Sequence, residues 1–163
     1  MRKKLTLGLA VALALMSTAA GYAATATSNF AVQIVISAQC LAATTSTLDF
    51  GTSGILTGNV DATNTLQVTC TNTTPYNVGL DAGTGAGATV ATRKMTSGAN
   101  TIDYTIYSDS GRTTVWGNSV GTNTVAAIGN GTAQSYTSYG RVPMQTTPTP
   151  GTYTDTITVT VTY

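Results

Sequence analysis

The amino-acid sequence predicts an all-β sandwich, and three observations support this fold class. After residue 23, Thr, Ser, Gly, Asn, Val and Tyr dominate, while Glu is absent and Leu and Lys are scarce. That composition favours strands over helices. Short runs of alternating apolar and polar residues recur, and clusters of Gly, Asn and Pro separate them. Several short strands with turns between them are typical of a β-sandwich.

The alternating runs give the expected strands in chain order. They are residues 30–36, 66–70, 76–80, 102–107 and 153–163. Turn-forming clusters occupy residues 71–75, 83–87, 97–100, 129–131 and 148–151. A chain rich in Gly and Thr can also be disordered, but the periodic Ile, Val and Tyr positions favour a packed core.

Residues 1–23 have the layout of a secretory signal peptide. Residues 2–4 are basic, residues 5–16 are apolar, and small residues lead to Ala23, after which we expect cleavage. The apolar run is about a dozen residues long, too short for a membrane anchor, which needs ~20. Cleavage leaves 163 − 23 = 140 residues, enough for one soluble domain with a two-layer core.

The composition argues against nucleic-acid binding and against catalysis. Four basic residues and six aspartates follow residue 23, so the net charge is 4 − 6 = −2 and no basic surface for nucleic acid is expected. The chain has no His and no Glu, the commonest general bases and metal ligands. We therefore expect no enzymatic activity, no metal and no cofactor.

Cys40 and Cys70 are the two cysteines, and an exported chain reaches an oxidising compartment. An even pair there predicts a disulfide. The loop between them holds 29 residues, so in the chain-entropy model the bond would stabilise the fold by ~3 to 4 kcal/mol. A redox or metal role is disfavoured because the spacing is far from Cys-x-x-Cys.

The closing run alternates strictly between threonine and apolar residues. Threonines stand at even positions, and the apolar residues are Ile157, Val159, Val161 and Tyr163. One face of this strand is expected to be buried and the other wet. If the chain ends here, the free edge of the strand must pair with a segment from the N-terminus or from another molecule, because a bare regular edge promotes aggregation.

An N-terminal run provides a matching row of large apolar side chains, Phe30, Val32, Ile34 and Ile36. It lies outside the predicted disulfide loop, so it could leave its own domain without dismantling the core. Complementation of a neighbouring subunit is one hypothesis. The alternative is that residues 30–36 form the first strand of a closed sandwich in their own chain, and alternation alone does not separate the two.

Several short motifs in order along the chain resemble the spore coat protein U domain, a family that includes the major pilins of archaic, Csu-type chaperone-usher pili. Together they cover nearly all of the chain after residue 23. They are Leu48-Asp49-Phe50-Gly51, Val68-Thr69-Cys70, the segment from Pro75 to Gly83, Arg93 with Met95, the segment from Asp103 to Asp109, Trp116-Gly117, the segment from Tyr139 to Pro143, and Gly151-Thr152-Tyr153-Thr154-Asp155.

The resemblance implies an incomplete immunoglobulin-like β-sandwich that is completed by donor-strand exchange. Residues 24–37 would be the donor strand, with Phe30, Val32, Ile34 and Ile36 facing inward, and residues 38–163 would be the pilin domain. The acceptor groove would be bordered by Ile157, Val159, Val161 and Tyr163. The partners would be a periplasmic chaperone, an outer-membrane usher and identical or related subunits. The chain would contact the membrane only through the usher.

This resemblance implies an extracellular pilus for adhesion and biofilm formation, and a single domain fits a shaft subunit better than a tip adhesin. Two alternatives stay open. The first is a secreted monomeric β-sandwich that binds carbohydrate or a receptor, and the second is a spore or cell coat protein that forms no pilus.

Two further expectations concern individual side chains. Trp116 is expected to pack in or near the core rather than to form a sugar-binding surface, because a lone Trp in a sandwich is usually buried. The three arginines after residue 23 are expected to pair with Asp81, Asp103 or Asp109.

Overall fold

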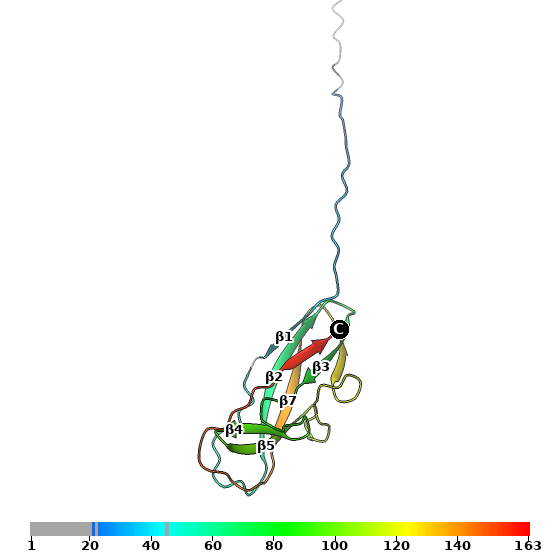
Figure 1. Ribbon diagram of the computed structural model, residues 1–163. Helices are drawn as coiled ribbons and strands as arrows, with labels where there is room; N and C mark the ends of the chain where they lie inside the picture. The colour runs from blue at the N-terminus through cyan, green and yellow to red at the C-terminus, as the bar shows by residue number, and fades with distance from the viewer. Residues whose placement is uncertain (1–20, 22, 45) are drawn as a thin grey trace, which may run out of the picture. The chain divides into compact units, whose positions relative to one another are not determined.

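The computed structural model describes residues 21, 23–44 and 46–163, so most of the predicted signal peptide lies outside the described residues. The chain divides into two units, Met1–Ile34 and Val35–Tyr163. The regular secondary structure of the described residues is entirely β, which confirms the predicted class (Figure 1). The strands are β1 Cys40–Thr44, β2 Val60–Cys70, β3 Pro75–Leu80, β4 Arg93–Ser97, β5 Asn100–Tyr107, β6 Val125–Ile128, β7 Ala133–Val142 and β8 Val159–Thr162.

The strands form two antiparallel sheets. The larger sheet has the order β1-β2-β7-β5-β4, and the smaller has the order β6-β3-β8. The ladder between β2 and β7 is the longest and runs from Val60 opposite Val142 to Thr69 opposite Ala133. β1 covers only residues 66–70 of β2, whereas β5 pairs with residues 139–141 at the other end of β7. Within the described part of the chain, the half of β2 that begins at Val60 therefore has no partner strand on its outer edge.

The core lies between the two sheets and follows the alternation of the strands. β2 buries Leu66 and Val68, and β3 buries Tyr76, Val78 and Leu80 against them. Trp116 is also buried, and its indole N–H donates to the carbonyl of Val78 at 2.8 Å. The prediction that this residue packs in the core is confirmed.

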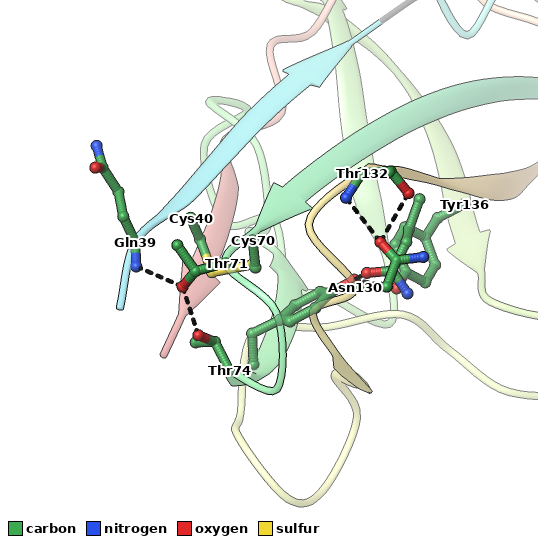
Figure 2. Close-up of a disulfide and its surroundings, with 10 residues drawn as sticks. Gln39, Cys40, Cys70, Thr71, Thr74, Asn130, Thr132 and Tyr136 are labelled. Atoms are coloured by element: carbon green, nitrogen blue, oxygen red, sulfur yellow. Dashed lines mark hydrogen bonds between the residues drawn. A yellow bond between two sulfur atoms is a disulfide. The ribbon is translucent and has the colours of Figure 1, made fainter. Parts of the chain in front are cut away.

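The disulfide between Cys40 and Cys70 joins the first residue of β1 to the last residue of β2, as predicted (Figure 2). The two cysteines face each other in the β1–β2 ladder. Beside them, the Thr71 hydroxyl accepts from the Gln39 N–H at 3.1 Å and contacts the Thr74 hydroxyl at 2.7 Å. The start of the folded domain is thus tied covalently and by hydrogen bonds to the β2–β3 turn.

The predicted and observed strands differ at both ends of the chain. Residues 66–70, 76–80 and 102–107 lie in β2, β3 and β5, as expected. Of the predicted run 153–163, only Val159–Thr162 forms a ladder, because the preceding residues change sheets and Thr154 bridges to Thr96 of β4. Residues 30–36 form no strand. No described segment is a helix long and apolar enough to cross a membrane.

We predict that replacing both Cys40 and Cys70 with Ala lowers the free energy of unfolding by ~3 to 4 kcal/mol, because the open chain regains the entropy of the closed loop. Urea denaturation of the chain from residue 24 measures this difference, with the reduced parent protein as the control. A loss below about 1 kcal/mol would show that the β1–β2 ladder holds this end without the bond.

Candidate functional site: an apolar cleft beside the C-terminal strand

A cleft of 1110 Å³ opens between the sheets at the Val60 end of β2. Two irregular segments, residues 46–56 and 147–157, form its rims. Its walls come from both sheets and are mostly apolar. The lining residues are Val60, Asn64, Leu66, Met95, Ile102, Tyr104, Ile106, Ser138 and Val142 from the larger sheet and Leu80 and Val159 from the smaller sheet. A cavity of this size and character suits an apolar polypeptide segment.

The rim 46–56 is held in place by three apolar side chains. Leu48 and Phe50 lie over Gly140, where a Cβ atom would come within 2.8 Å of each. Phe50 also meets Tyr104 edge to face, with 6.0 Å between ring centroids. Leu56 is buried, and its N–H donates to the Thr147 hydroxyl at 2.8 Å, which joins the two rims. Glycine at position 140 thus allows this rim to pack directly on β7.

The C-terminal segment has a free backbone edge beside this cleft. β8 pairs with β3 and lies at the edge of its sheet. β1, the edge strand of the other sheet, has Cα atoms within 8 Å of β8, but no ladder joins them in the described part of the chain. The smaller and larger sheets are therefore adjacent here without being connected by backbone hydrogen bonds.

The hydrogen bonds at Thr158 identify which backbone groups face the free edge. The Asp81 N–H donates to the Thr158 carbonyl at 3.2 Å, so the backbone of Thr158 points toward β3. In an antiparallel ladder, alternate residues direct their N–H and C=O groups to opposite neighbours. The backbone groups of Ile157, Val159 and Val161 therefore point toward the free edge.

The predicted acceptor residues occupy different environments. Ile157 and Val159 line the cleft, and Val161 is partly buried opposite Val78. Tyr163 is 58% exposed and follows the end of the ladder. The cleft thus includes two of the four predicted positions, and assignment of all four to an acceptor groove stays a prediction.

The predicted donor residues are exposed. Phe30, Val32 and Ile34 have 87%, 85% and 81% of their surface accessible, and Ile36 has 72%. Their insertion into another subunit stays a prediction.

A carboxylate near each end of the segment 155–158 accepts several hydrogen bonds. Asp155 accepts from the Tyr104 hydroxyl at 2.8 Å and from the Thr84 N–H at 2.8 Å. Burial, with the Asp155 hydrogen bond as a second cause, raises the pKa of Tyr104 well above its ordinary value, so the hydroxyl stays a donor. Asp81 accepts from the N–H groups of Thr158 and Gly83, each at 3.0 Å.

Arg93 is fully buried and uses backbone carbonyls as partners. Its guanidinium donates to the carbonyls of Leu80, Asp81, Val90 and Trp116 at 2.7 to 3.2 Å. Several carbonyl acceptors satisfy the donors of a guanidinium that has lost its hydration. This contact fixes the end of β3, from which Asp81 projects.

The expected partners of the arginines were wrong. Arg93 has hydrogen bonds with carbonyl groups, and Arg141 forms a two-point ion pair with Asp61, with both N···O distances at 2.8 Å. Arg112 approaches the same carboxylate at 3.3 Å. Asp103 pairs instead with Lys94 at 2.7 Å. Asp61 lies 80 residues from Arg141, so the sequence offered no local signal for the pair.

Sequence reasoning placed Ile157 of the rim 147–157 at the acceptor groove, but it missed the rim 46–56 and the two carboxylates as parts of the same site. The rim 46–56 has no sustained alternation and gives no strand signal. The available signal was motif composition, since Leu48–Gly51, Pro75–Gly83 and Gly151–Asp155 were recognised as short motifs and all three contribute to this region. Their proximity in space became visible only with the fold.

We predict that the Asp81 carboxylate stabilises the folded chain most at pH values above the ordinary pKa of an aspartate. Partial burial opposes ionisation, but hydrogen bonds from Thr158 and Gly83 and the charge of Arg93 outweigh it and lower the pKa of Asp81. A lowered folded-state pKa contributes stability that is complete above the unfolded-state pKa and is lost as the pH falls through the folded-state pKa. The unfolding free energies of the parent chain and of Asp81→Asn should therefore differ more at about pH 6 than at about pH 2.5. Equal differences at both pH values would contradict this assignment.

Comparison with known proteins agrees with this architecture. A structural match is one chain of the crystal structure of the CsuC-CsuE chaperone-tip adhesion subunit pre-assembly complex from archaic chaperone-usher Csu pili of Acinetobacter baumannii. The TM-score is 0.56 at 24% identity, and the match covers 77% of this chain. This chain spans 40% of the length of that chain. The likeness shows the shared fold, an immunoglobulin-like sandwich.

Two sequence comparisons bear on the family. Protein U of Myxococcus xanthus is 33% identical over 156 residues, which cover 86% of this chain and 87% of that protein. The family model described as Spore Coat Protein U domain matches residues 26–160. The chain therefore belongs to the spore coat protein U domain family.

Proposed function

We propose that this chain is a structural pilin subunit that polymerises by donor-strand complementation into an archaic chaperone-usher pilus. The observation that favours this function most is the free backbone edge of β8 beside a 1110 Å³ apolar cleft. An unpaired edge and an apolar cleft together suit an added β-strand, whose backbone pairs with the edge and whose alternate side chains fill the cleft.

The donor would be residues 24–37 of a second subunit. Phe30, Val32, Ile34 and Ile36 share one face of an extended chain, and each is largely exposed in the structure. Burial of four such side chains at roughly 1.5 to 3 kcal/mol each contributes ~6 to 12 kcal/mol before ordering costs. The donor backbone would pair with the free groups of Ile157, Val159 and Val161. The contact is head to tail and need not close, so it produces a filament.

A strand-accepting subunit needs protection before assembly, because an open apolar cleft promotes aggregation. A periplasmic chaperone would occupy the cleft, and an outer-membrane usher would exchange it for the donor of the next subunit. The structural match to a chaperone-subunit pre-assembly complex supports this arrangement. The completed polymer would lie at the cell surface and act in adhesion and biofilm formation.

A coat protein is the second candidate function. The match to the Spore Coat Protein U domain and the likeness to Protein U of Myxococcus xanthus favour it. A coat protein could use the same strand exchange, so the cleft does not separate the two. Neighbouring genes for a chaperone and an usher would favour the pilus.

A secreted monomer with a closed sandwich is less well supported. In the described residues, β8 has a partner strand on one edge, whereas a closed sandwich would cover this cleft with a strand of its own.

We predict that Ile34→Asp abolishes polymer formation, because the new carboxylate would enter an apolar cleft without a partner. Val35→Asp is the matched control, since it introduces the same charge at the next residue, on the opposite face of the extended strand. Exported protein is compared by electrophoresis in detergent, unheated and boiled, with the disulfide kept oxidised.

The parent and Val35→Asp should give a ladder of subunit multiples that collapses only on boiling, whereas Ile34→Asp should migrate as a monomer. A normal ladder from Ile34→Asp would contradict the donor assignment. A parent protein that is monomeric in both lanes would favour the closed, monomeric sandwich.

A further inference from the structure

We propose that Asp155 and Asp81 are positioning residues that hold the segment 155–158 with its free edge toward the cleft, ready to pair with a donor strand. This inference rests on the proposed function and adds two residues to it. Asp155 is among the residues that line the cleft, whereas Asp81 is not. Each acts through the backbone of the acceptor segment.

Asp155 ties the acceptor segment to both sheets with one carboxylate. Its Oδ2 accepts from the hydroxyl of Tyr104, a buried residue of β5 in the larger sheet. Its Oδ1 accepts from the N–H and hydroxyl of Thr84, in the loop after β3 of the smaller sheet, at 2.8 and 2.9 Å. The same oxygen accepts the N–H of Thr156 at 2.7 Å. The carboxylate therefore fixes the backbone where the chain passes from one sheet to the other.

Asp81 continues the hydrogen bonding between β3 and the C-terminal segment beyond the last pair of the β3–β8 ladder. The last ladder pair is Leu80 opposite Val159. One residue further, the Asp81 N–H donates to the Thr158 carbonyl, and the Asp81 carboxylate accepts the Thr158 N–H. Both backbone groups of Thr158 are thus satisfied on the side of β3. Ile157 and Val159 are left with their backbone groups toward the free edge.

Gly83 lies against both carboxylates. This residue has φ of +80°, and a Cβ atom there would come within 2.1 Å of the Asp155 carboxylate. The Gly83 N–H also donates to Asp81 at 3.0 Å. Glycine is required on both counts, because it adopts the left-handed conformation and leaves room for Asp155. Two of the motifs found in the sequence, Pro75–Gly83 and Gly151–Asp155, thus interlock through these contacts.

The position of these bonds indicates a role in binding as well as in folding. Between the Thr154–Thr96 bridge and the start of β8, the segment has no regular ladder. A segment with few backbone bonds opens easily, and a donor that paired with a mobile edge would have to order it first. The two carboxylates order the edge before the donor arrives. Removing one of them should therefore weaken donor binding more than a substitution elsewhere that lowers the free energy of unfolding by the same amount.

The test uses the chain from residue 24 with Ile34→Asp, which disables its own donor strand. A fluorescent synthetic peptide of residues 24–37 is added, and its dissociation rate is measured with and without Asp155→Asn. Asp109→Asn is the matched control, because Asp109 also accepts backbone N–H groups, from Thr113 and Thr114, and does not line the cleft. Urea unfolding without peptide measures the stability of each variant.

We expect Asp155→Asn to speed peptide dissociation about tenfold, while Asp109→Asn leaves the rate unchanged at a comparable loss of stability. Equal rates for Asp155→Asn and its parent, or equal acceleration by both variants, would overturn the inference. If Asp155→Asn does not fold, Thr84→Val removes one hydroxyl donor to the Asp155 carboxylate from a residue that does not line the cleft. Thr84→Val should then speed dissociation in the same direction, and an unchanged rate would overturn the inference.

The two proposals fail in different ways. If the parent with Ile34→Asp binds no peptide, strand exchange is wrong and the inference falls with it. If that parent binds but the carboxylate variants bind equally well, only the positioning role is wrong.

Discussion

The fold depends on one constraint, which is that among the described residues the C-terminal segment is hydrogen-bonded along one edge only. Thr154 bonds to β4, Thr158 bonds to Asp81, and the even-numbered residues of β8 pair with β3, so these residues have backbone partners within the domain. Backbone groups need partners when they are removed from water. The odd-numbered residues must therefore stay at a wet edge or receive another strand, and the cleft beside them is the space that such a strand would fill.

Polar side chains hold together the parts of this sandwich that a small apolar core does not reach. Arg93 donates to four backbone carbonyls, two of them at the end of β3, and Asp155 connects β5 of the larger sheet to the loop after β3 of the smaller sheet. In the described residues, every buried side-chain polar atom has a hydrogen-bond partner. Such complete networks favour a unique geometry. The loops around the cleft can therefore stay ordered although the space between the sheets is not filled.

The sequence predicted strands where apolar residues alternate over several positions, and it missed β7, which directs small and polar residues inward. β2 and β3 bury Leu66, Val68 and Val78, which give a clear period of two. β7 directs Ser138 and Gly140 inward, beside the rim that packs on Gly140, so its pattern does not read as a buried strand. The cleft itself depends on contacts between distant segments, such as Leu56 with Thr147, that no local pattern contains.

The alternation of the closing run explains how an open edge can be both soluble and selective. The threonines face solvent and the residues between them face inward, so the segment exposes little apolar surface on its outer face. A strand that pairs only through its backbone would leave the cleft empty and gain little. A strand with large apolar side chains at every second position pairs with the backbone groups of the edge and, at the same time, fills the cleft. Residues 30–36 of this chain have large apolar side chains at every second position. The outer face of β8, which carries threonines, could not fill the cleft in this way.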